Sequence, residues 1–116
     1  MSYCSKFHRK EKLISRTLEI DEELYNQLEF LSKEIYDASI SKLVNAAIED
    51  LLETEDIQIY KRKNNSYVSR SFLIRDSLLE GLYELKKKYR VPIYLLVNIA
   101  IRNELEEENE ENKITL

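Results

Sequence analysis

Polar and hydrophobic residues alternate in a short run near the start of the chain, residues 15–20 (Ser-Arg-Thr-Leu-Glu-Ile). Alternation with a period of two is typical of a β-strand that buries one face. Leu18 and Ile20 then point inward. The outward positions are Ser15, Thr17 and Glu19.

The same pattern returns 54 positions later, at residues 69–74 (Ser-Arg-Ser-Phe-Leu-Ile). Phe72 and Ile74 take the inward positions of this second strand. The outward positions are Ser69, Ser71 and Leu73. A lone strand of this length is not stable in water, so we expect the two strands to pair with each other.

Each strand is followed by apolar residues at helical spacing. After the first strand, one stripe covers residues 21–36, with Asp21 as a suitable N-cap, and a more apolar stripe covers 40–52. Residues 37–39 break the two predicted helices. The second copy repeats this order, with the offset falling from 54 to 53 after a one-residue deletion in the break.

We therefore predict a mostly α-helical domain with one short two-stranded antiparallel ribbon, built from two copies of the same unit. One Gly and one Pro in 116 residues favour helices with short connections. The predicted segments are a basic N-terminal arm (1–13), the first copy (14–53), a connector (54–67), the second copy (68–107) and an acidic tail (108–116).

Asn45 and Asn98 hold matching places in the two apolar helices. One hypothesis is that they meet across the axis relating the copies and fix their register, as buried asparagines do in coiled coils. Exposure at the edge of the stripe is the simpler alternative, and we favour it.

Charge is segregated along the chain, although the net charge is −4 and the pI is about 5.2. Residues 19–56 hold most of the acidic excess, whereas basic residues flank both predicted strands. Because near charges outweigh distant screened ones, an acidic protein of this kind can still present an anion-binding face. A single cysteine, Cys4, and no long apolar segment indicate a cytoplasmic protein outside the membrane.

The order strand, helix, break, helix resembles the ribbon–helix–helix superfamily of MetJ/Arc/CopG-type repressors. The resemblance is carried by residues 16–24 and 39–48 in the first copy, and by 70–78 and 93–101 in the second. Two copies in one chain are similar to TraY-type relaxosome proteins. The resemblance implies an intramolecular pseudo-dimer, monomeric in solution, whose ribbon enters the major groove of double-stranded DNA. It leaves open whether chains pair again on DNA.

In such a protein the outward strand positions read base edges. Hydroxyl groups can donate or accept, a carboxylate can accept from the N4 amino group of cytosine, and leucine can pack on a thymine methyl group. The set lacks the Arg, Lys, Asn or Gln usual in this superfamily. The candidates are Ser15, Thr17, Glu19, Ser69, Ser71 and Leu73.

Phosphate contacts are expected at the N-termini of the second helices, where backbone N–H groups point outward. Basic side chains at the strand ends and in the connector are further candidates, with a solubilising loop as the alternative for the connector cluster. The full set is Arg16, Arg70, Ser39, Ser41, Lys42, Tyr94, Lys61, Arg62 and Lys63.

Residues suited to catalysis are scarce. His8 is the only histidine, Cys4 beside it supplies too few ligands for a metal, and the chain has no Gly-rich phosphate loop. We expect no enzyme, cofactor or metal. The alternative to DNA binding is a protein-binding module that neutralises a toxin or regulator through its acidic surface.

Replacing Lys61, Arg62 and Lys63 by Ala should weaken binding to all duplexes alike. Each lost phosphate contact lowers the slope of log affinity against log salt by about 0.9, which titrations at several salt concentrations measure. An unchanged slope would mean that the cluster is only a solvated loop.

Overall fold

The computed structural model describes residues 11–60 and 66–114, the last seven of these by their backbone alone. A two-stranded antiparallel sheet and four helices make up the fold, which confirms the predicted mostly helical class. The elements are β1 (Leu13–Asp21), α2 (Glu22–Phe30), a π-helical turn η1 (Leu31–Ile35), α3 (Ile40–Thr54), β2 (Tyr67–Arg75), α4 (Asp76–Tyr89) and α5 (Ile93–Ile114).

The two strands pair as predicted, and Thr17 lies opposite Ser71. These two residues are also equivalent in the 54-residue repeat, so the local twofold centre of the ribbon lies between them. Each strand is nine residues long, which extends the predicted runs at both ends. Beyond the strands, the backbone amide of Glu22 donates to the carbonyl of Ser66 (3.2 Å). The backbone amide of Asp76 likewise donates to the carbonyl of Lys12 (2.9 Å). These two bonds are again equivalent in the repeat.

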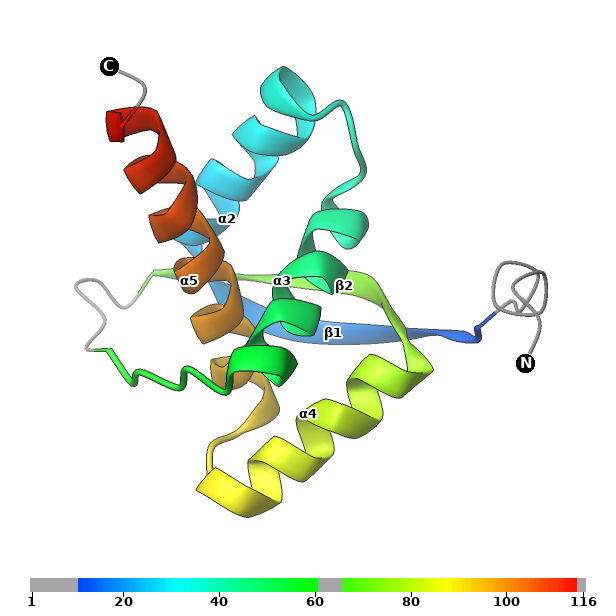
Figure 1. Cartoon of the computed structure of the whole chain (residues 1–116). Helices are drawn as coiled ribbons and strands as arrows, with labels where there is room; N and C mark the ends of the chain where they lie inside the picture. Colours follow the sequence, from blue (N-terminus) through cyan, green and yellow to red (C-terminus); the bar gives the residue numbers. More distant parts are fainter. Residues whose placement is uncertain (1–10, 61–65, 115–116) are drawn as a thin grey trace, which may run out of the picture.

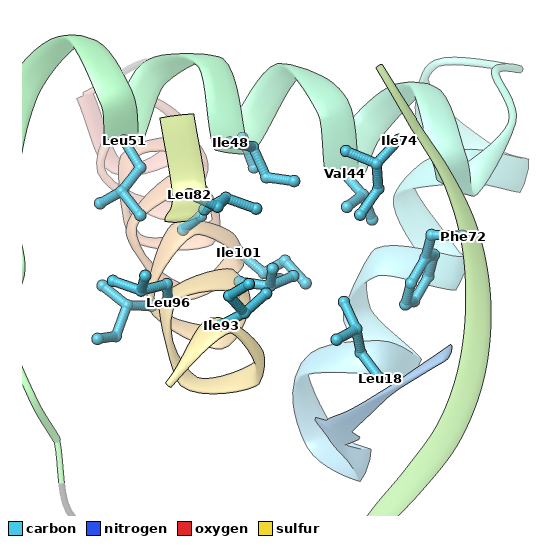
Figure 2. Close-up of a cluster of buried hydrophobic side chains, with 14 of the residues drawn as sticks. Leu18, Val44, Ile48, Leu51, Phe72, Ile74, Leu82, Ile93, Leu96 and Ile101 are labelled. Atoms are coloured by element: carbon cyan, nitrogen blue, oxygen red, sulfur yellow. The ribbon is translucent and has the colours of Figure 1, made fainter. Parts of the chain in front are cut away.

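One face of the ribbon is covered by helices. Figure 1 shows α3 and α5 crossing in front of the strands, with α2 and α4 to either side. In Figure 2, side chains of α3 and α5 meet those of the inward strand positions. Burial of each large apolar side chain contributes about 1.5–3 kcal/mol, so this shared core holds the ribbon to the helices. Among its members are Leu18, Val44, Ile48, Leu51, Phe72, Ile74, Leu82, Ile93, Leu96 and Ile101.

The first copy has one residue more than the second, and the sequence comparison of the copies placed this difference in the break between the helices. In the structure the extra residue lies inside the first helix. Asp37 and Arg90 both have left-handed backbones (φ 48° and 58°) and are 53 residues apart. The offset has therefore changed before Asp37. In η1 the amide of Tyr36 donates to the carbonyl of Leu31 (2.9 Å), five residues back, so a π-helical turn accommodates the insertion.

Gly81 is explained by close packing of α4 on α3. A Cβ atom at this position would lie 2.6 Å from Leu52 Cδ1, well inside van der Waals contact. The glycine costs about 1 kcal/mol of helix propensity relative to Ala, and it makes room for the Leu52 side chain.

The first part of the connector packs against α5. Ile57 and Tyr60 lie against the core, and the Arg102 guanidinium lies 4.8 Å from the centre of the Tyr60 ring. The Tyr60 hydroxyl donates to the carboxylate of Asp21. Asp21 precedes α2 as predicted, but its side chain does not cap the helix. Residues 1–10 of the predicted basic arm, and Lys61, Arg62 and Lys63, lie outside the described residues.

Glu55 fixes the other end of this segment to α4. Its carboxylate accepts hydrogen bonds from Lys88 Nζ (2.8 Å) and the Tyr89 hydroxyl (2.7 Å). These two hydrogen bonds lower the pKa of Glu55 below its ordinary value, and the bond from Lys88 has the larger effect. Within the described ranges, the helices are too short or too polar to cross a membrane.

Because both strands belong to one chain, the thermal midpoint should not change on hundredfold dilution. An obligate dimer would lose about 2.7 kcal/mol over that range, which lowers the midpoint of a domain this size by about 10 °C. Calorimetry or circular dichroism at two concentrations measures the difference. A midpoint that falls steeply with dilution would show that folding requires a second chain.

Candidate nucleic-acid interface

The outward face of the ribbon brings together all six predicted base-reading residues. Each of them is exposed, including Leu73, whose side chain is 47% accessible. At the centre, Thr17 Oγ1 and Ser71 Oγ share a hydrogen bond of 2.7 Å. One hydroxyl donates to the other, so the pair keeps one donor and several acceptor positions directed to solvent.

The face is longer than the sequence indicated, because the strands extend further. Leu13 and Tyr67 continue the outward alternation and are 52% and 46% exposed. They are equivalent in the repeat. The same alternation, followed two residues further toward each N-terminus, would have identified them.

Asn45 and Asn98 hold the outer edges of the ribbon. Asn45 Nδ2 donates to the carbonyl of Leu73 (2.7 Å), and its Oδ1 accepts from the amide of Arg75 (3.0 Å). Asn98 does the same for β1, donating to the Glu19 carbonyl (2.9 Å) and accepting from the Asp21 amide (2.9 Å). The second helix of each copy therefore binds the strand of the other copy.

Both sequence hypotheses for these asparagines are wrong. Neither residue is exposed, since Asn45 is 9% and Asn98 0% accessible. They do not bind each other either, because the second Nδ2 hydrogen bond of each goes to its own helix, at Ser41 and Tyr94 (both 2.7 Å). The side chains replace the strand partners that a two-stranded ribbon lacks at its edges.

The N-terminus of α3 lies beside the C-terminal end of β2. Ser39 Oγ caps the helix by accepting from the Lys42 amide (3.2 Å), and Ser41 Oγ accepts from the Leu73 amide (3.2 Å). The predicted group Ser39, Ser41 and Lys42 is thus assembled at one end of the ribbon. An open depression of about 440 Å³ lies here, lined in part by Leu13, Ala46 and Leu73.

Tyr94 lies apart from that group, in the first turn of α5, and is 39% exposed. The strand arginines Arg16 and Arg70 turn toward the helices. Arg16 lies over the Tyr83 ring (5.8 Å to its centre) and donates to its hydroxyl (3.0 Å), while Arg70 lies 5.0 Å from the centre of the Tyr25 ring. Such contacts contribute about 0.5–1 kcal/mol, so each arginine would leave a modest interaction to reach a phosphate.

Comparison of the chain with protein-family models, with curated proteins and with solved structures finds no match. Any functional assignment therefore rests on the geometry of this interface.

Asn98→Ala should lower the free energy of unfolding by about 2–3 kcal/mol, because two partly buried backbone groups of β1, the Glu19 carbonyl and the Asp21 amide, lose their partner. Asn103→Ala is the matched control, since its partly exposed side-chain amide donates to the Asp56 carbonyl (2.9 Å) and, among the described residues, holds no strand edge, so it should cost under about 1 kcal/mol. Urea denaturation measures both.

Hydrogen exchange provides a local test of the same account. The Asp21 amide should lose protection in Asn98→Ala and keep it in Asn45→Ala, where the Arg75 amide should be the one exposed. Equal protection of both amides in both variants would contradict the edge-binding role.

Proposed function

We propose that this protein is a sequence-specific double-stranded DNA-binding protein that inserts its β-ribbon into the major groove. The observation that carries the proposal is the row of exposed side chains on the outward ribbon face, centred on the Thr17–Ser71 pair. A two-stranded ribbon fits the major groove, where each base pair presents a distinct set of donors and acceptors. Hydroxyl groups in the middle of the face are suited to reading that set.

The repeat supports a tandem ribbon–helix–helix arrangement with an intramolecular pseudo-dimer. Equivalent residues of the two copies make equivalent contacts, as the bonds of Asn45 and Asn98 illustrate. The N-terminus of α3 and that of α5 flank opposite ends of the ribbon. Backbone N–H groups at helix N-termini bind phosphates, and we assign these two termini to the two strands of a duplex. In this proposal they position the ribbon, and the outward side chains discriminate between bases.

The proposed role is that of a transcriptional repressor or a DNA-processing accessory factor in the cytoplasm, without catalysis or a cofactor. The described residues supply the ribbon and the helix termini. The basic segments at 1–10 and 61–63 add charge that complements the phosphate backbone.

A second candidate function is supported by a cluster of carboxylates. Asp50, Glu104 and Glu107 have ligand oxygens within 4.8 Å of one another on α3 and α5. A basic surface of a toxin or regulator would complement this acidic group. Under that alternative, binding of the partner would depend on these three residues and would not depend on the ribbon.

Changing both Thr17 and Ser71 to Ala should weaken the preference for a selected operator by about tenfold or more, while leaving the affinity for random duplexes and the salt slope unchanged. Loss of a good base contact costs about 1–3 kcal/mol, and no charge is removed. Fluorescence anisotropy with the selected and a scrambled duplex measures the preference. The fold should survive, because both side chains are exposed.

Leu18→Asp serves as a contrasting variant on the opposite face of the same strand. Leu18 is 6% exposed, and an unpaired carboxylate there costs several kcal/mol, so this variant should unfold. If the double Ala variant keeps full preference for the operator, the ribbon is not the reader and the protein-binding function takes precedence.

A further inference from the structure

The two ends of the ribbon face are chemically unequal, although the backbone is close to twofold symmetric. Antiparallel pairing places Ser15 opposite Leu73 at one end, and Glu19 opposite Ser69 at the other. Glu19 and Leu73 are equivalent in the repeat, so a duplicated position carries a carboxylate in one copy and an isobutyl group in the other.

The Leu73 end is apolar and carries an available cation. Leu13, Leu73 and Lys42 all line the depression beside α3. Arg75 also lies here, but Glu49 pairs with it (2.5 Å), which offsets its charge. In the part of the chain that the structure describes, Lys42 forms no ion pair, so it can meet a phosphate.

The Glu19 end is acidic, because Glu19 and Asp21 stand at the positions of Leu73 and Arg75. Tyr67 takes the place that Leu13 holds at the other end. The flanking helix is α5, where Pro92 and Leu95 stand at the positions of Ser39 and Lys42. This end therefore lacks both the capping hydroxyl and the lysine of its counterpart.

We propose that the chain binds an asymmetric DNA site in one fixed orientation, with a thymine-bearing half-site under the Leu73 end and a cytosine-bearing half-site under the Glu19 end. The inference rests on the proposed function and names its substrate class. Leu73 packs against thymine C5-methyl groups in the groove, while Lys42 and the α3 amides hold the adjacent phosphate. Glu19 accepts from the cytosine N4 amino group and is repelled by the O6 and N7 acceptors of guanine.

Selection from random duplexes, followed by competition binding, tests the inference. The wild type should select a sequence with two different halves. It should bind this duplex about tenfold or more tightly than either palindrome made by duplicating one half, because each palindrome replaces one matched half-site. Circular dichroism of each variant below confirms that it is folded before binding is measured.

The repeat supplies matched variants that make the face symmetric. Glu19→Leu gives both ends a leucine, and the preferred duplex should change to the palindrome of the thymine-bearing half. Leu73→Glu gives both ends a carboxylate, and the preferred duplex should change to the palindrome of the cytosine-bearing half. Both positions are exposed, and their backbone carbonyls remain bound by Asn98 and Asn45.

The outcomes separate this inference from the proposed function. A wild type that selects a palindrome, with no change of preference in either variant, would overturn the asymmetric site and leave sequence-specific DNA binding intact. A wild type that selects no sequence at all would overturn both.

Discussion

Pairing between two strands from distant parts of one chain is the constraint on which the rest of the structure depends. A two-stranded ribbon is marginal on its own, because each strand has one edge without a partner. Asn45 and Asn98 supply those edges with side-chain amides, and the inward side chains join the core of α3 and α5. Neither copy could meet both requirements alone, since each asparagine binds the strand of the other copy.

The same constraint fixes the outward face. Side chains alternate strictly along a strand, so burial of Leu18 and Phe72 obliges Thr17 and Ser71 to point outward. A slip of one residue in the pairing would place polar groups in the core. Packing energy on one face therefore specifies the chemistry that the other face presents, which links the stability of the fold to its proposed use.

The elements, the pairing of the strands and the six outward residues could be predicted, because periodicity and duplication are local signals. The contacts of Asn45 and Asn98 could not, since they depend on how α3 and α5 cross the ribbon. Arg16 and Arg70 meet tyrosines that occupy non-equivalent positions of the two copies, Tyr83 and Tyr25, which alignment of the repeat does not indicate. The π-helical turn could not be predicted either. An extra residue in the helix and an extra residue in the break change the repeat offset from 54 to 53 in the same way.

The most direct test of the central claim is an NMR titration of the labelled protein with a selected duplex, following backbone amide signals. The account predicts the largest shifts in β1 and β2, centred on Thr17 and Ser71, with further shifts at the N-termini of α3 and α5. The acidic group at Asp50, Glu104 and Glu107 should remain unchanged. Shifts confined to that group, or no shifts in the ribbon at saturating duplex, would contradict DNA reading by this face.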